Sequence, residues 1–80
     1  MPTQEITFDA VANRIASVLR VPASALTPET TLTDLGADSF MLVEMVVDLQ
    51  EEFNAFFTQA SLREVFNLGE LVSLLREKAA

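Results

Sequence analysis

The chain has 80 residues, 50% of them hydrophobic, and a net charge of −7 from 12 acidic and 5 basic side chains. This length and hydrophobic share fit one small folded domain and argue against disorder. The acidic balance argues against binding to nucleic acid or to an anionic membrane surface, both of which need clustered Lys and Arg. It favours protein partners with basic patches, which electrostatic attraction brings together quickly.

Four residue types are missing, because the sequence has no Cys, His, Tyr or Trp. Without Cys there is no disulfide and no thiolate nucleophile. Without His or Cys the chain cannot build a Ser-His-Asp triad, the usual zinc site or the commonest general base. We therefore expect no metal site and no enzymatic activity, and any thiol needed for thioester chemistry must come from an attached group.

The N-terminus and the longest apolar stretch indicate where in the cell the protein is expected. Residues 1–5 lack the basic and apolar segments of a secretory signal. The apolar stretch 40–49 is interrupted by Glu44 and Asp48 and is too short to span a membrane. We expect a cytoplasmic monomer with no membrane span. A single domain should cover residues 1–80, with a core from about residue 7 to 78 and a flexible segment over residues 1–6.

A first helix is predicted to end at about Arg20, with Thr7 or Asp9 as its cap. Pro22 ends it, because the residue before a proline is pushed out of the α region. Arg14 lies between the apolar positions of this helix, where we expect it to face water and balance local acids. The apolar residues recur at helical spacing: Phe8, Val11, Ala12, Ile15, Val18 and Leu19.

The segment 21–38 is predicted to be a long loop. Thr27 and Pro28 favour a short helical turn within it, with Thr27 as cap and Pro28 at the first helical position. Three leucines should anchor the loop to the core: Leu26, Leu32 and Leu35.

A second helix is predicted from Ser39 to Phe53, after Gly36, a residue type that interrupts regular secondary structure. Ser39 therefore lies at a helix N-terminus, where free N–H groups and the positive end of the helix dipole favour a phosphate group. The simpler alternative is that Ser39 is only an N-cap. The core stripe of this helix is Leu42, Val46, Leu49 and Phe53, with Met45 beside them. The acids on its outer side are Glu44, Asp48, Glu51 and Glu52.

Two further helices complete the predicted fold. The pattern Ser61-Leu62-Arg63-Glu64 is typical of a capping box and predicts a short third helix. Asn67 is predicted to cap a last helix that ends at about Lys78, with Arg76 and Lys78 in its final turn. Its core stripe is Leu68, Leu71, Val72 and Leu75. The fold class is therefore all-α, a small four-helix bundle of three longer helices and one short helix.

Three segments carry a resemblance to a known family: Leu35-Gly36-Ala37-Asp38-Ser39, Val43-Glu44 and Leu49-x-Glu51-Glu52-Phe53. They resemble the attachment motif of acyl carrier proteins, and the resemblance runs from about Phe8 to Lys78. In that family the serine of the Asp-Ser pair carries 4′-phosphopantetheine through a phosphodiester.

The resemblance implies that Ser39 bears the arm, which a phosphopantetheinyl transferase adds from coenzyme A with Mg²⁺, and that Asp38 supports the attachment. The thiol of the arm would hold acyl groups as thioesters for fatty-acid, specialised lipid or polyketide biosynthesis. Acyl-loading and acyl-processing enzymes with basic patches would be the partners. The residues expected to meet partners are Phe40, Met41, Glu44, Val47, Asp48 and Glu51.

Departures from the family pattern make this surface less charged. Met41 and Gln50 stand where the family often has an acid, and Phe40 is bulkier than the usual leucine. Helices of a small bundle can part slightly, so an apolar cleft is expected. The residues expected to line the cleft are Val43, Val47, Phe40, Phe57 and Leu62.

Two alternatives to an acyl carrier stay open. One is an aminoacyl or peptidyl carrier of non-ribosomal synthesis, against which Ala37-Asp38 counts mildly because those carriers often have a different pattern before the serine. The other is an unmodified acidic helical module, in which Ser39 is a cap and the acidic helix is a subunit contact.

Overall fold

The computed structural model describes residues 5–35 and 38–79, so Gly36 and most of the expected flexible N-terminal segment lie outside the described residues. The helices are α1 (Phe8–Leu19), α2 (Ser39–Phe53), α3 (Gln59–Arg63) and α4 (Leu68–Lys78). Two short 3-10 helices, η1 (Ala23–Ala25) and η2 (Thr33–Leu35), lie between α1 and α2. The predicted all-α fold, with three longer helices, one short helix and a long first loop, is confirmed.

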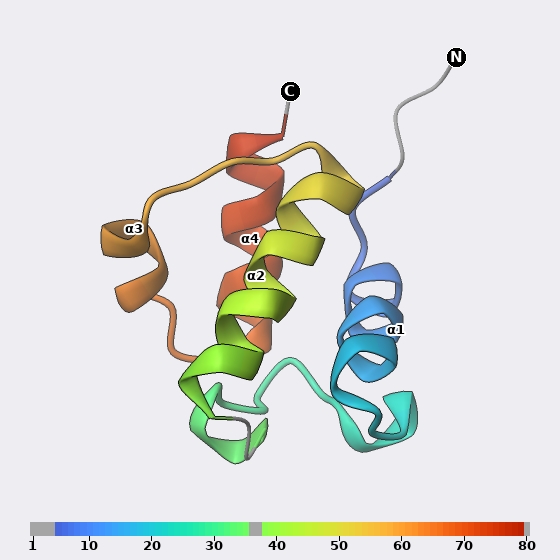
Figure 1. Ribbon diagram of the computed structural model, residues 1–80. Helices are drawn as coiled ribbons and strands as arrows, with labels where there is room; N and C mark the ends of the chain where they lie inside the picture. The colour runs from blue at the N-terminus through green and yellow to red at the C-terminus, as the bar shows by residue number, and fades with distance from the viewer. Residues whose placement is uncertain (1–4, 36–37, 80) are drawn as a thin grey trace.

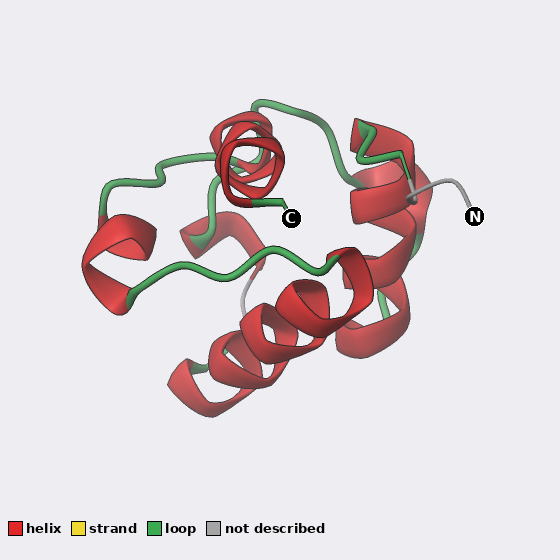
Figure 2. Cartoon of the chain, turned by 90° about the horizontal axis from the view of Figure 1, so that it is seen from above, coloured by secondary structure: helices red, strands yellow, loops and turns green. Residues whose placement is uncertain are grey.

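The three longer helices surround the core, and α3 lies to one side of them. Figures 1 and 2 show this arrangement from two directions at right angles. Within residues 5–35 and 38–79, no helix combines the length and hydrophobicity needed to cross a bilayer. The buried apolar residues come from all three longer helices and from three short segments: Ile6, Val11, Ala12, Ile15, Ala16, Leu26, Met45, Leu49, Phe53, Ala55, Leu68, Leu71, Val72 and Leu75.

The core begins earlier in the chain than predicted. Ile6 is only 8% exposed, and its carbonyl oxygen accepts a hydrogen bond of 2.7 Å from Nε of Arg76 in the last turn of α4. The prediction that the flexible segment extends to residue 6 is therefore wrong at Ile6. Local sequence could not indicate that Ile6 is ordered, because the hydrogen bond joins residues 70 positions apart.

Helix α1 begins and ends through local chemistry. The Thr7 hydroxyl accepts a hydrogen bond of 3.1 Å from the N–H of Ala10, which makes Thr7 the cap rather than Asp9. At the other end, Arg20 adopts the left-handed conformation with φ of 60° and its N–H bonds to the carbonyl of Ala16. The helix therefore stops before Pro22, as predicted.

The long loop is fastened to the start of α4. The N–H of Leu68 bonds to the carbonyl of Thr30, and the N–H of Gly69 bonds to the carbonyl of Pro28, both at 2.9 Å. These bonds satisfy N–H groups that the first turn of a helix leaves free. A Cβ at Gly69 would stand only 3.3 Å from the Pro28 oxygen, so glycine permits the close approach.

The helical turns of the long loop lie at η1 and η2, on either side of the predicted position. At the predicted position, residues 27–30 form a non-helical turn, which hydrogen bonds between Thr27 and Thr30 close. The leucine anchors are confirmed, since Leu26 is buried and Leu32 and Leu35 pack against the core.

The start of α3 also differs from the prediction. The Thr58 hydroxyl accepts a hydrogen bond of 3.2 Å from the N–H of Ser61, so α3 begins at Gln59 and Ser61 lies inside it. The capping box predicted at Ser61 is wrong, because Thr58 lies three residues earlier and supplies the same interaction. By contrast, Asn67 caps α4 as predicted, accepting a bond of 2.9 Å from the N–H of Glu70.

Candidate functional site

The N-terminus of α2 is organised by Asp38. Its carboxylate accepts a hydrogen bond of 2.9 Å from the N–H of Met41, and its carbonyl accepts one of 3.0 Å from the N–H of Leu42. Asp38 is thus the N-cap, and Ser39 is the first residue of the helix. The alternative that Ser39 is only a cap is wrong, because Asp38 already fills that role.

Position 39 lies between two exposed neighbours. Asp38 is exposed, and the side chain of Phe40 is 70% exposed. A helix N-terminus attracts phosphate through its free N–H groups and its dipole. These features fit a phosphodiester-linked group at this end of α2, where an enzyme that attaches it can approach.

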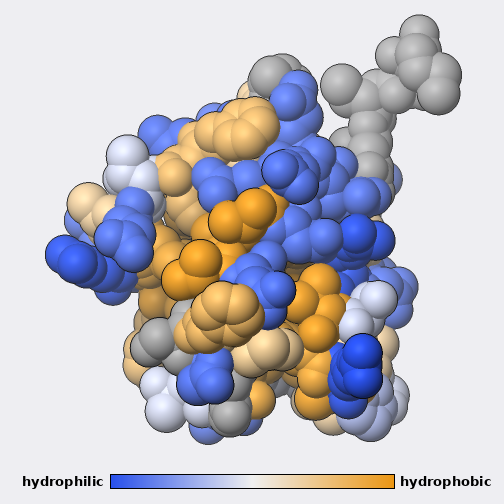
Figure 3. All heavy atoms as spheres, viewed as in Figure 1, coloured by the Kyte–Doolittle hydropathy of each residue, from blue (hydrophilic) through white to orange (hydrophobic). Residues whose placement is uncertain are grey.

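The outer surface of α2 combines apolar and acidic side chains. Phe40, Val43 and Val47 are 70%, 52% and 46% exposed, and Glu44 and Glu51 are also exposed. Hydrophobic side chains gather across the middle of this face of the molecule (Figure 3). Exposed apolar residues at helical spacing, flanked by acids, are typical of a surface that meets a protein partner.

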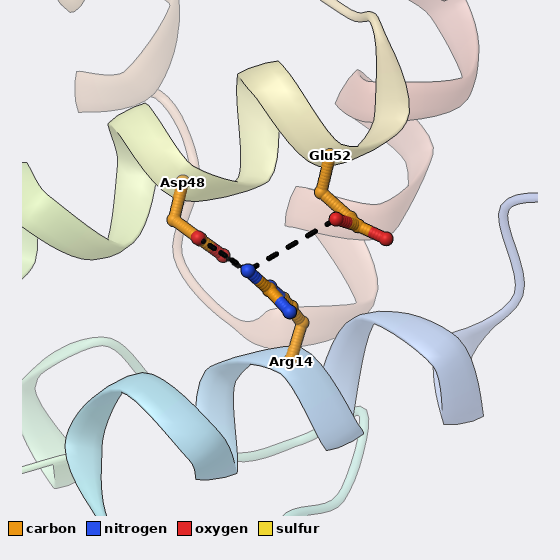
Figure 4. Close-up of polar contacts among 3 residues, drawn as sticks. All are labelled: Arg14, Asp48 and Glu52. Carbon is orange, nitrogen blue, oxygen red and sulfur yellow. Dashed lines mark hydrogen bonds and ion pairs between the residues drawn. The ribbon is translucent and has the colours of Figure 1, made fainter.

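Asp48 lies on α2 like the other residues predicted to contact partners, but its side chain bonds to α1. Nε and a terminal nitrogen of Arg14 donate to its two carboxylate oxygens at 2.6 and 2.8 Å, which joins α1 to α2 (Figure 4). The same guanidinium lies 4.0 Å from an oxygen of Glu52. Asp48 is half-buried, so its predicted place on the outer side of α2 is wrong. The expectation that Arg14 balances acids is confirmed, although these acids come from another helix.

This ion pair shifts both groups in the direction of ionisation. The hydrogen bond from Arg14 lowers the pKa of Asp48 below its usual value, against the opposing effect of partial burial. The same hydrogen bond and the charge of Asp48 raise the pKa of Arg14. Asp48 therefore stays charged, and both of its carboxylate oxygens are already engaged by Arg14.

An apolar pocket of about 190 Å³ lies between α2 and α3. It contains four of the five residues that we expected in a cleft, and Phe40 is the exception because its side chain points into solvent. The residues that line it are Leu42, Val43, Val46, Val47, Gln50, Phe57, Thr58, Gln59 and Leu62.

Two side-chain contacts in this region were not predicted. One is the Arg14–Asp48 pair, and the other is a hydrogen bond of 2.9 Å from the N–H of Phe57 to Oε1 of Gln50. Opposite charges on Arg14 and Asp48 were the only sequence signal for the first. The second had none, because a glutamine beside an apolar stripe usually faces solvent.

The family model described as a phosphopantetheine attachment site matches residues 9–76 of this chain. The chain belongs to the acyl carrier protein family. It carries acyl groups on a covalently attached 4′-phosphopantetheine. The thiol of that group supplies the thioester chemistry for which the sequence has no cysteine.

Relatives of this carrier extend over nearly its whole length. The acyl carrier protein of Thermotoga maritima is 37% identical over 79 residues, which cover 98% of each chain. That of Picosynechococcus is 37% identical over 76 residues, covering 94% of this chain and 93% of the relative. The solution structure of holo acyl carrier protein from Geobacter metallireducens matches with a TM-score of 0.78 at 28% identity, covering 98% of this chain and 86% of that one.

Membership of this family has two general consequences. Proteins of the family are carriers and are normally not catalysts. They interact with a phosphopantetheinyl transferase, which attaches the arm, and with acyl-processing enzymes, which load and modify the cargo.

Proposed function

We propose that Ser39 is the residue that carries the 4′-phosphopantetheine arm. The observation that supports this most directly is the position of Ser39 as the first residue of α2, immediately after the exposed cap Asp38. The phosphate would lie at the positive end of a 15-residue helix. Asp38 holds the first turn of the helix in place and thereby presents the serine.

We propose that the outer surface of α2 is what partner enzymes contact. Phe40 and Val47 offer apolar area, and Glu44 and Glu51 offer charges to a basic patch. Met41, in the first turn, is half-buried and would contribute only its exposed part. We leave Asp48 out of this surface, because both of its carboxylate oxygens are bonded to Arg14.

We propose that the pocket between α2 and α3 receives the acyl chain. Its walls are mainly aliphatic and aromatic, and it extends along α2 from Leu42, close to Ser39, to Gln50. An apolar chain attached at Ser39 gains free energy by leaving water for such a pocket. The protein would then carry its cargo without catalysing a reaction of its own. We also propose that it acts in the cytoplasm and as a monomer.

The pathway stays a prediction, with fatty-acid, specialised lipid and polyketide biosynthesis as the candidates. The names of the relatives favour an acyl cargo over the aminoacyl or peptidyl alternative. The match to a phosphopantetheine attachment site argues against the unmodified module.

The test is intact mass spectrometry of the protein after incubation with coenzyme A, Mg²⁺ and a broad-specificity phosphopantetheinyl transferase. We expect the mass to increase by one phosphopantetheine, and peptide mapping to locate it on Ser39. Ser39→Ala should gain nothing. Ser17→Ala is the matched control, because Ser17 is an exposed serine near the end of α1 and its loss should leave the modification intact.

The assignment to Ser39 would be overturned by full modification of folded Ser39→Ala, or by a label that maps to another serine. Circular dichroism of each variant shows whether the helices have formed. The fold should survive in Ser39→Ala, because Asp38 and not Ser39 caps the helix.

A further inference from the structure

The pocket between α2 and α3 is small for its role. Its volume of about 190 Å³ lies below the roughly 300 to 1,000 Å³ typical of sites that enclose a whole drug-sized ligand. A long acyl chain can be buried there only if one wall moves.

The wall formed by α3 is the one that packs most weakly. None of its five residues, Gln59–Arg63, is fully buried, whereas α2 contributes Met45, Leu49 and Phe53 to the core. Elements with few buried apolar contacts move at the lowest free-energy cost. Helix α3 also lies apart from the other three helices, connected by extended segments (Figures 1 and 2).

The segment that leads into α3 is held to α2 by Gln50. Oε1 of Gln50 accepts a hydrogen bond of 2.9 Å from the backbone N–H of Phe57, and both residues line the pocket. Leu42 lies three residues after Ser39, and Gln50 lies eight residues further on, which is about 12 Å along the helix axis. The hydrogen bond therefore stands at the end of the pocket away from the attachment point.

We propose that Gln50 determines how long an acyl chain this carrier can bury, because its hydrogen bond to Phe57 closes the far end of the pocket. Gln50 acts as a positioning residue, through the backbone of Phe57, and needs no contact with the chain. Without this bond the segment before α3 is free to move outward, and a longer chain can enter. The inference rests on the proposed attachment at Ser39 and on the proposed place of the acyl chain.

The experiment loads the arm with butanoyl, hexanoyl, octanoyl or decanoyl groups and measures unfolding of each form in denaturant. Each methylene that enters the pocket should raise the folding equilibrium constant by about fourfold. In the wild type this increase should stop once the chain reaches the far end. In Gln50→Met, which keeps the volume but loses the acceptor, the increase should continue to longer chains.

Two variants separate the hydrogen bond from other effects. Gln50→Glu keeps an oxygen that can accept the hydrogen bond. The stability of this variant should therefore stop rising at the same chain length as that of the wild type. Asn13→Met replaces another amide by methionine, at an exposed position on α1 that does not line the pocket, and should also leave the limit unchanged. Gln50→Ala gives a second test of the lost bond in case Gln50→Met packs badly.

An identical limit in the wild type, Gln50→Met and Gln50→Ala would overturn the role of Gln50. A stability that does not depend on chain length, in protein whose mass shows the acyl arm on Ser39, would overturn the burial of the chain but not the attachment. Failure to attach the arm at Ser39 is seen separately by mass and would overturn both.

Discussion

At the scale of single residues, the contact between Arg14 and Asp48 has the clearest physical consequence. Two hydrogen bonds of 2.6 and 2.8 Å place the guanidinium and the carboxylate in a paired geometry that joins α1 to α2. Pairs of this geometry are stronger than single surface contacts, although both side chains remain partly in contact with water. The pair therefore orients α2 more than it stabilises the fold.

Arg14→Gln should raise the pKa of Asp48 back toward its ordinary value of 3.8, because the main cause of the lowered value is removed. A carboxylate whose pKa is lowered by folding stabilises the folded state above its ordinary pKa, and this contribution disappears as the pH falls through the lowered value. The melting temperature of Arg14→Gln should thus fall by a few degrees at most at neutral pH and approach that of the wild type below pH 3.8.

Carboxyl NMR titration of Asp48 and melting curves at several pH values measure these two effects. Glu44→Gln is the control, since Glu44 is an exposed acid on the same helix. An unchanged pKa of Asp48 in Arg14→Gln would contradict the prediction.

At the scale of elements, α2 is capped at both ends and has one buried side and one exposed side. Its N-cap is supplied by Asp38, and its C-cap, Asn54, adopts the left-handed conformation with φ of 51°. One side is buried through Met45 and Leu49, and the other exposes the apolar and acidic residues of the proposed partner surface. A helix held at both ends in this way presents its first residue in a defined position.

Asp38→Ala should destabilise the protein by about 1 kcal/mol, because the N–H of Met41 loses its partner. Asp38→Asn should lose much less, since asparagine caps a helix about as well as aspartate. Urea unfolding measures both values. Comparing the rates of modification by the transferase then tests the charge, because a stable but slowly modified Asp38→Asn would show that the carboxylate acts beyond capping. Equal stability of the two variants would contradict the role of Asp38 as cap.

At the scale of the whole molecule, α1, α2 and α4 form a shared core to which the long loop is fastened and from which α3 stands apart. A domain of this size has a free energy of unfolding of only several kcal/mol, so a few buried residues determine whether it folds. Met45 is fully buried at the centre of this core, whereas Met41, one turn earlier on α2, is half-buried.

Met45→Ala should therefore cost about 2 to 5 kcal/mol of unfolding free energy, through lost burial and the cavity that remains. Met41→Ala makes the same exchange on the same helix and should cost clearly less. Denaturant unfolding of the two variants gives the comparison. Equal losses, or a larger loss for Met41→Ala, would contradict the orientation of α2 described above.

The sequence alone determined the features that depend on near neighbours. The apolar spacing predicted α2 from Ser39 to Phe53 and the four core residues of α4, and the caps Thr7 and Asn67 were correctly named among the candidates. Each of these rests on contacts within about four residues, such as Thr7 with Ala10. The motif at Asp38 and Ser39 likewise indicates the family and the proposed attachment point from the sequence alone.

Only the tertiary structure decided which of these residues meet across the molecule. The bond of Arg14 to Asp48 joins residues 34 positions apart, and that of Arg76 to Ile6 joins residues 70 positions apart. No periodic pattern encodes such pairs, because they depend on how the helices pack and not on the spacing within one helix. The far end of the pocket likewise depends on the tertiary structure, because the segment after α2 brings the N–H of Phe57 within 2.9 Å of the Gln50 side chain.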